Sequence, residues 1–363
     1  MAYLTLNLEK LRSNYTCLDT LFKKNGIAWA VVTKILCGNK EYLAEVLQLG
    51  VKQVCDSRIT NLKNIKQLNP DIETIYIKPP ARNAVANVVR YADISMNTEI
   101  RTIEQLSVEA VRQQKKHRII IMLELGELRE GVMGDHLINF YSRIFKLENI
   151  EVAGIGTNLS CLYGVLPNQD KLIQLSLYKQ LIEAKFNRAI PLVSGGSSVT
   201  IPMLIQGTVP RGINHFRVGD SLFLGSDVYN NGTLEGMHAD VFSLHGQIIE
   251  LTEKPAVPSG EMGSNVEGHS FEFDDSLIGT STCRAIVDIG LLDVEENHIT
   301  ALDPSIQFAG ASSDMLVLDL GANSRRYKVG DWIDFSVDYM GALRLLNSRY
   351  IDKKIIRPDQ GAS

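Results

Sequence analysis

The sequence predicts an α/β protein made of a (β/α)₈ TIM-type barrel followed by a C-terminal all-β domain. Three observations lead to this prediction. Eight short apolar segments alternate with longer amphipathic segments up to about residue 230. Some of them, such as IIIML at 119–123, are apolar on both faces, as buried parallel strands are. After Asp227 the helical patterns give way to short alternating strands separated by Gly, Pro, Asn and Asp.

The expected barrel strands are apolar runs bounded by turn residues or by helical patterns. In chain order they are 28–34, 51–56, 74–78, 92–96, 117–125, 152–158, 192–194 and 216–224. Helical patterns such as 40–50, 100–115 and 171–186 lie between them. Strict alternation favours parallel strands closed into a barrel, with the active site where the strands end. An open doubly wound sheet is the alternative, but no GxGxxG motif opens a helix after the first strand.

The domain division follows the change in sequence pattern. We assign residues 1–230 to the barrel and residues 231–363 to the β domain. Residues 3–8 are strand-like and precede the barrel, so residues 1–10 are candidates to pair with the β domain. Its expected strands are 239–251, 283–289, 315–320 and 332–337, and no helix is expected there. Residues 254–275, rich in Gly, Glu, Ser and Pro, are expected to form a long loop.

Composition narrows the class of function. The net charge of −5 argues against a nucleic-acid polymer as partner, because no basic excess is available to neutralise phosphates. No apolar stretch approaches the roughly 20 residues of a membrane span, and no signal-peptide pattern is recognisable. The five cysteines lack CxxC spacing, and the seven histidines form no metal-ligand motif. These features indicate a cytoplasmic protein that acts on a small molecule without a metal.

A lysine, Lys34, closes the first expected strand. A lysine at this place in a barrel opens onto the active-site loops, where its amine can hold an aldehyde cofactor as an imine. By itself a lysine after a strand is more often a solvated loop residue. The interpretation therefore depends on the groups that other strands supply.

The seventh and eighth expected strands supply such groups. The Gly-Gly-Ser-Ser segment that ends in Ser197 and Ser198 can direct backbone N–H groups and two hydroxyls at one point, which suits a phosphate. An ordinary loop is the alternative. Arg217 is either a surface ion-pair residue or a permanently charged donor to a heteroaromatic nitrogen. An arginine does not give up its proton, so it would leave that nitrogen unprotonated.

Over most of the chain these segments resemble the pyridoxal-phosphate (PLP) enzymes of the alanine racemase type. Residues 4–14 are similar to the first strand and helix of that family, and VVTK at 31–34 is similar to the segment that bears its PLP lysine. The other matching segments are LELGELREG at 123–131 (family DTGMxRxG), GIGTN at 154–158 (GxxTH), RVG at 217–219 (RPG), SDM at 313–315 (MDQ) and DY at 338–339 (NY).

The resemblance implies a role for each matching residue. Lys34 would hold the cofactor and act as one catalytic base, Arg217 would bond the pyridine nitrogen, and Arg129 would orient the substrate carboxylate. The backbone around Ser313 would come from a second subunit, because the family works as a head-to-tail homodimer in which each β domain completes the partner's site. The remaining cofactor-binding positions are Asn158, Ser197, Ser198, Gly219 and Tyr339.

The chain also departs from the family pattern. Leu291 stands where the family has the tyrosine that serves as second base, Asn158 replaces the histidine that supports that tyrosine, and Met122 replaces a lysine of the fifth strand. A leucine cannot transfer a proton, so a standard alanine racemase is not expected. The segments 157–164, 310–314 and 338–343 are similar instead to the ornithine racemase branch, which implies a longer, basic amino acid such as ornithine, lysine or arginine as substrate.

A different second base must then be found. Cys161 follows the sixth expected strand, and a thiolate can be a competent base; a buried small residue is the alternative interpretation. Asp293 and Asp314 are further candidates, either as the base or as partners of the distal ammonium of the substrate, with structural roles still open.

The sequence therefore predicts a PLP-dependent racemase of a basic amino acid, in which the α-proton leaves one face of the substrate and returns on the other. An alanine or broad-specificity racemase is one alternative. A decarboxylase of basic amino acids is another, although its relatives offer an acidic group to the pyridine nitrogen where this chain has Arg217. A non-catalytic PLP carrier would not need the β domain.

Overall fold

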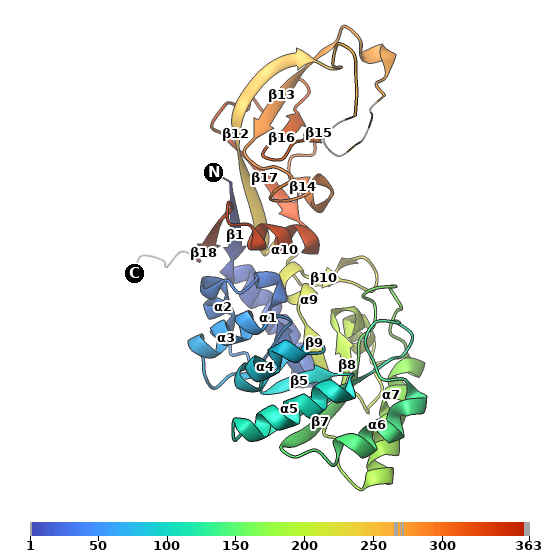
Figure 1. Ribbon diagram of the computed structural model, residues 1–363. Coiled ribbons are helices and arrows are strands. Elements are labelled where there is room, and N and C mark those ends of the chain that lie inside the picture. The colour runs from blue at the N-terminus through green and yellow to red at the C-terminus, as the bar shows by residue number, and fades with distance from the viewer. Residues whose placement is uncertain (1, 265–267, 269, 271, 359–363) are drawn as a thin grey trace. The chain divides into compact units, whose positions relative to one another are not determined.

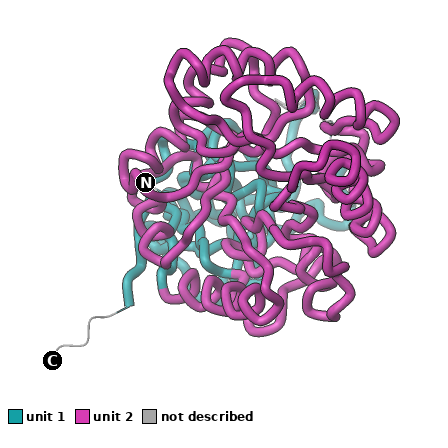
Figure 2. The backbone as a smooth tube through the Cα atoms, turned by 90° about the horizontal axis from the view of Figure 1, so that it is seen from below, with its two compact units in different colours: residues 1–8, 240–363 teal, residues 9–239 magenta. Residues whose placement is uncertain are grey.

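The computed structural model describes residues 2–264, 268, 270 and 272–358, and these form two compact units (Figures 1 and 2). The barrel unit comprises residues 9–239, and the β unit comprises residues 1–8 and 240–363. Each unit is described by itself below.

The barrel unit is a closed barrel of eight parallel strands, which confirms the predicted fold class (Figure 1). Strand β9 closes the barrel onto β2, with Arg217 beside Ala30 in the register. The strands are β2 (Ala28–Val32), β3 (Gln53–Asp56), β4 (Glu73–Tyr76), β5 (Ile94–Asn97), β6 (His117–Leu123), β7 (Ile150–Thr157), β8 (Leu192–Ser197) and β9 (His215–Val218).

Helices follow the strands and pack around the outside of the barrel, as in α5, whose buried Ile103, Leu106 and Ala110 recur at helical spacing. The α-helices are α1 (Leu8–Lys24), α2 (Lys40–Leu47), α3 (Ile59–Leu68), α4 (Val85–Tyr91), α5 (Ile100–Arg112), α6 (Leu137–Ile144), α7 (Gln169–Phe186), α8 (Ile201–Ile205) and α9 (Asp220–Leu224). Short 3₁₀ turns, η1 (Lys34–Leu36), η2 (Arg82–Ala84), η3 (Gly134–His136) and η4 (Ser198–Thr200), lie among them. None of the described helices is long and apolar enough to cross a membrane.

Several expected strand ends are wrong, and three of them lie next to candidate site residues. Strand β2 ends at Val32, so Lys34 begins the turn η1 instead of closing the strand. Strand β9 ends at Val218, and Asp220–Leu224 form the helix α9. Strand β8 continues through Gly195 and Gly196 to Ser197, so these glycines do not form a turn. They make room for packing, because an added Cβ would lie 2.8 Å from Ile213 at Gly195 and 2.3 Å from the Phe216 ring at Gly196.

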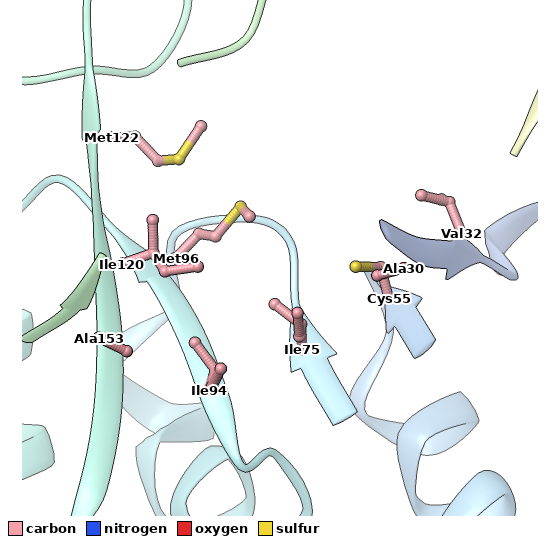
Figure 3. Packing of buried hydrophobic residues seen from close by; sticks show 9 residues of the cluster. All are labelled: Ala30, Val32, Cys55, Ile75, Ile94, Met96, Ile120, Met122 and Ala153. Carbon is pink, nitrogen blue, oxygen red and sulfur yellow. The ribbon is translucent and has the colours of Figure 1, made fainter. Parts of the chain in front are cut away.

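An apolar cluster with side chains from β2–β7 fills part of the barrel interior. Figure 3 shows the apolar side chains pointing from successive strands into a shared core. They are Ala30, Val32, Cys55, Ile75, Ile94, Met96, Ile120, Met122 and Ala153. On β8 and β9, by contrast, Ser194, His215 and Arg217 are buried. Polar groups buried on two neighbouring strands require partners within the barrel, because water cannot reach them.

The barrel unit ends at Ala239, beyond the residue 230 that the sequence pattern indicates. The reason is a contact with α1. The buried amide of Asn14 donates to the carbonyls of Leu222 (3.1 Å) and His238 (2.9 Å) and accepts from the His238 N–H (2.8 Å). These bonds hold residues 234–238 to the barrel helices, and the short pair β10 (Ser226–Asp227) and β11 (Gly232–Thr233) precedes them.

The β unit is built on an antiparallel sheet in the order β14-β17-β12-β13-β16-β15. The N-terminal strand β1 (Tyr3–Asn7) pairs antiparallel with β12 and parallel with β18. The other strands are β12 (Phe242–Pro255), β13 (Ser281–Val287), β14 (Ile299–Ala301), β15 (Gln307–Ala311), β16 (Leu316–Asp319), β17 (Trp332–Val337) and β18 (Asp352–Ile356). Residues 254–255 of the expected loop belong to β12, and part of the remainder lies outside the described residues.

The expectation that the β unit lacks helices is wrong. Residues Tyr339–Asn347 form α10, which begins after Asp338, whose side chain accepts from the Gly341 N–H at 2.7 Å. Ala342, Leu345 and Leu346 form its buried face. The helix has only nine residues, so its helical spacing covers too few positions to stand out among the strand-like segments around it. The short turns η5 (Asp275–Leu277) and η6 (Glu296–His298) also lie in this unit.

The packed interior of the barrel predicts a contrast between two truncations. Ile120 is fully buried in the core, whereas Val108 on α5 is 71% exposed. We expect Ile120→Ala to lower the free energy of unfolding by about 2–5 kcal/mol, because it leaves a cavity. Val108→Ala should change it by less than about 0.5 kcal/mol. Urea denaturation of both variants measures the difference, and equal losses would contradict this description of the core.

Candidate active site

Lys34 is an exposed residue that lies just beyond β2, at the end of the barrel where the parallel strands terminate. The residue before it anchors the backbone. Thr33 donates from Oγ1 to Oδ2 of Asp56 at 2.9 Å, and the buried Asp56 also accepts from the Arg58 N–H (2.9 Å) and the Asn61 amide (3.1 Å). Burial raises the pKa of Asp56 in spite of these bonds. The segment that carries Lys34 is thereby tied to the end of β3.

Arg217 lies inside the barrel and is 7% exposed, so the surface ion-pair interpretation is wrong. Its Nη1 donates to the carbonyl oxygen of Ser194 (3.0 Å) and to the Ser194 hydroxyl, and its Nη2 donates to the carbonyl oxygen of Thr157 (2.8 Å). Burial lowers the pKa of Arg217, but a guanidinium stays protonated in proteins. The side chain is therefore a fixed cation held by neutral oxygens of β7 and β8.

Two helix starts lie side by side at the ends of β8 and β9. Ser197 ends β8 and caps η4, which Ser198 begins and α8 continues, while Gly219 ends the β9 segment and caps α9. The Ser221 N–H donates to the Ser198 hydroxyl at 3.2 Å and links the two starts. N–H groups at a helix start lack acceptors within the helix and attract anions. This part of the barrel can therefore hold a phosphate.

Arg129, Asn158 and Cys161 are brought together beyond β6 and β7. Nη1 of Arg129 donates to the Cys161 sulfur. The Asn158 amide oxygen, in the orientation that satisfies both groups, accepts from Nη2 (2.8 Å) and Nη1 (3.1 Å) of Arg129. Arg129 also pairs with Glu130. Cys161 is exposed, so it is not the buried small residue considered as the alternative.

One carboxylate that the sequence interpretation missed organises the loop around Cys161. Glu127 is 1% exposed and accepts the backbone N–H groups of Ser160 (3.1 Å), Cys161 (2.9 Å), Leu162, Tyr163 (2.9 Å) and Val165 (3.1 Å). Burial opposes the charge, but these N–H groups outweigh it and hold the pKa of Glu127 below its usual value. The sequence offered one sign of this role, because Glu127 stands where the family stretch has a methionine.

The same loop needs backbone conformations that few residues adopt. Ser160 has a φ of 55° and Gly164 a φ of 70°, which lie in the left-handed region. These turns bracket the N–H groups of residues 161–163, all of which bond to Glu127. A single carboxylate thus replaces the acceptors that a regular element would supply.

The predicted residues of the β unit lie in two segments that are bonded to each other. The N–H groups of Leu291 and Leu292 donate to the carbonyl oxygens of Ser312 (2.9 Å) and Ser313 (3.0 Å). The Ser313 hydroxyl donates to the exposed Asp314 (2.7 Å).

Asp293 directly follows Leu292 in the first of these segments, whereas Tyr339 lies elsewhere in the β unit. Asp293 accepts from the Ser348 hydroxyl at 2.7 Å and lines a cavity of about 330 Å³ with Arg344 and Tyr350. Tyr339 is the first residue of α10, directly after its cap Asp338, which bonds to His298 at 2.8 Å.

Met122, which stands at the family's lysine position, is buried on β6 beside Ile120 and Met96 (Figure 3). It lies in the apolar part of the interior. Met122 therefore does not supply the positive charge that a lysine would bring to β6.

Comparison with known proteins identifies relatives over the whole chain. The family model "Alanine racemase, N-terminal domain" matches residues 6–227. An ornithine racemase of Acetoanaerobium sticklandii is 38% identical over 354 residues, which cover 97% of this chain and 99% of that protein. A lysine racemase of Thermotoga maritima is 29% identical over 96% of this chain and 97% of that protein.

A solved structure shows the same fold. The alanine racemase of Bartonella henselae, which was determined with covalently bound pyridoxal phosphate, superimposes with a TM-score of 0.73 at 15% identity, over 98% of this chain and 99% of that one. The family model spans more than half of the chain, and the ornithine racemase aligns with nearly all of it. The chain therefore belongs to the alanine racemase N-terminal domain family, as the resemblance in its sequence indicated.

Proposed function

We propose that this protein is a PLP-dependent racemase of free basic amino acids, with ornithine or lysine as substrate. The names of the ornithine and lysine racemases support the reaction and the substrate class, and the cofactor of the Bartonella henselae enzyme supports PLP. The observation that carries the proposal is the set of groups at one end of the barrel. Lys34 follows β2, the buried Arg217 lies on β9, and the paired helix starts at Ser198 and Gly219 follow β8 and β9, which are neighbouring strands.

These groups fit the chemistry of PLP. A lysine amine reacts with an aldehyde, two helix starts suit a phosphate, and a fixed cationic donor suits a pyridine nitrogen. When bound, PLP draws electrons from the α-carbon of an amino acid and so makes the α-proton acidic. Arg217 keeps its proton and so would leave a pyridine nitrogen beside it unprotonated, which would favour proton exchange at one carbon over decarboxylation.

Lys34 is proposed as the base on one face of the substrate, where its amine removes or returns the α-proton. Arg129 is proposed to orient the substrate carboxylate. Its contacts with Cys161 and Asn158 place the thiol next to the group that would bind this carboxylate.

Cys161 is the second base that we propose, because Leu291 cannot transfer a proton. The thiol is exposed, its loop is held by Glu127, and its sulfur accepts from a guanidinium. A cationic donor interacts most strongly with a sulfur that carries negative charge, and a thiolate is a competent base.

The β unit is proposed to complete the site. Tyr339 would bind the phosphate, and the backbone at Ser313 would help Arg129 to orient the substrate carboxylate. The carboxylate of Asp293 or of Asp314 would face the distal ammonium of a basic substrate. As in the family, this contribution would come through a head-to-tail homodimer. A cytoplasmic location is also proposed, because no disulfide joins the five cysteines, all of which lie in the described part of the chain.

The first test is a substrate panel with the PLP-loaded protein. We expect ornithine or lysine to lose optical activity faster than alanine or serine. Lys34→Ala should lower that rate by about 10²–10⁴-fold and abolish the visible absorbance of the bound cofactor, because the base and the amine are lost together. Release of carbon dioxide would indicate a decarboxylase. Bound PLP without any change in optical activity would indicate a carrier.

A second test separates the two bases. Cys161→Ala should reduce racemisation by about 10²–10⁴-fold. Exchange of the α-proton with deuterated solvent should survive for the enantiomer whose proton faces Lys34 and fail for the other. Cys17→Ala, which changes an exposed cysteine on α1, is the matched control and should leave both rates unchanged. Racemisation by Cys161→Ala at the wild-type rate would exclude the thiol as base.

Glu127 gives the loop a predictable pH dependence. Its pKa is lower in the folded protein than the ordinary value of 4.5, so its bonds stabilise the fold above that value, and this stabilisation is lost as the pH falls through the folded pKa. At pH 7 Glu127→Gln should lower the free energy of unfolding by about 1–3 kcal/mol, and the difference from wild type should shrink below about pH 4.5.

Hydrogen exchange locates this effect. Glu127→Gln should increase exchange in residues 160–165 at pH 7, where the bonds are otherwise intact. Glu183→Gln is the matched control, because Glu183 also accepts a backbone N–H, that of Ile190 at 2.8 Å, but precedes β8 at the other end of the barrel. Equal exchange of residues 160–165 in both variants would show that Glu127 does not hold the loop.

A further inference from the structure

Two buried serine–histidine pairs lie inside the barrel unit. Ser95 on β5 is 2.8 Å from Nε2 of His117, the first residue of β6, and Ser194 on β8 is 2.7 Å from Nδ1 of His215, the first residue of β9. The hydroxyls differ in their other partner. Ser95 accepts from the Asn97 amide at 2.9 Å, whereas Ser194 accepts from Arg217. The barrel unit therefore contains one serine–histidine pair that contacts an arginine and one that does not, and the two can be compared.

The second pair belongs to a chain of hydrogen bonds whose direction is fixed at its far end. A carboxylate only accepts, so Gln53 donates its amide N–H to Glu73, which Arg118 also contacts. The amide oxygen of Gln53 therefore faces Nε2 of His215, at 3.1 Å, and accepts from it. His215 then carries its proton on Nε2 and offers Nδ1 as an acceptor.

The chain of hydrogen bonds continues from His215 through Ser194 to Arg217. The Ser194 hydroxyl donates to Nδ1 of His215, so its oxygen lone pairs remain to accept from Nη1 of Arg217. Burial, together with the charge of Arg217, lowers the pKa of His215 to about 3, which keeps the imidazole neutral near pH 7. The neutral tautomer is the form that this direction requires.

The contacts of Arg217 then define the plane of its guanidinium. Nη1 donates to two oxygens of Ser194 and Nη2 donates to Thr157, which accounts for three of its N–H groups. The carbonyl oxygens of Thr157 and Ser194 belong to neighbouring strands, and their bonds to the guanidinium limit its rotation. The Ser194 hydroxyl is the only one of these acceptors whose direction depends on another side chain, that of His215.

We propose that Ser194 and His215 are positioning residues for Arg217 that orient its remaining N–H donors toward the pyridine nitrogen of the cofactor. The inference rests on the proposed function for the identity of that cofactor. Neither residue touches the substrate in this proposal; both act through the guanidinium.

The test compares Ser194→Ala with Ser95→Ala. Each change removes a buried hydroxyl that is bonded to a buried histidine, so both variants should lose similar stability in urea denaturation. Only Ser194→Ala should weaken PLP binding, by about tenfold in equilibrium dialysis, and change the absorbance spectrum of the bound cofactor. A second pair keeps the test independent of folding defects. His215→Gln retains an acceptor for Ser194 and should bind PLP more tightly than His215→Leu.

The outcomes separate this inference from the proposed function. Equal PLP affinity and equal spectra in Ser194→Ala and Ser95→Ala would overturn the positioning role while leaving the racemase proposal in place. Identical binding by His215→Gln and His215→Leu would overturn it as well. A wild-type protein that does not bind PLP would overturn the proposed function itself, before any variant is compared.

Discussion

The buried charge of Arg217 is the constraint on which the rest of the barrel depends. Moving a cation out of water is costly unless hydrogen bonds replace its hydration. Here Ser194 and Thr157 replace the water molecules that would hydrate the guanidinium, so β7 and β8 must place these oxygens level with Arg217. This requirement accounts for the buried Ser194 on β8, next to the apolar cluster that β2–β7 supply. A buried cation adds little to stability, so the presence of Arg217 indicates that this core also has another role.

Three carboxylates accept hydrogen bonds from backbone N–H groups of loops and helix starts, and so hold these segments in place. Asp56 accepts from Arg58 next to the segment that carries Lys34, and Glu127 accepts five N–H groups around Cys161. In the β unit Asp338 accepts from Gly341 directly beside Tyr339. A loop or helix start that is held in this way keeps a nearby side chain in place. Each of the three lies next to a residue with a proposed role in chemistry or cofactor binding.

The fold is shared with alanine racemases, but the site is not the same. Superposition with the Bartonella henselae enzyme at 15% identity establishes the architecture and nothing finer. The differences are at Leu291, Asn158 and Met122, and the latter two lie in the barrel unit. Asn158 bonds to Arg129, and Met122 packs in the apolar core. Arg129 stands where the family stretch also has an arginine, so Cys161, the proposed second base, is the group by which this site would differ chemically.

The sequence by itself determined the alternation of strands and helices, the closed barrel and the family, and it singled out Lys34 and Arg217 as candidate site residues. Those conclusions depend on periodicity and on residue types at strand ends, which are local properties. It placed the ends of β2, β8 and β9 wrongly, because the packing of Ile213 and Phe216 against Gly195 and Gly196 involves other parts of the chain. Only the tertiary structure decided that Glu127 reaches residues 160–165, that Asn14 holds His238, and that Gln53 reaches His215. Such bonds join residues far apart in sequence, and their geometry depends on backbone directions that no local pattern encodes.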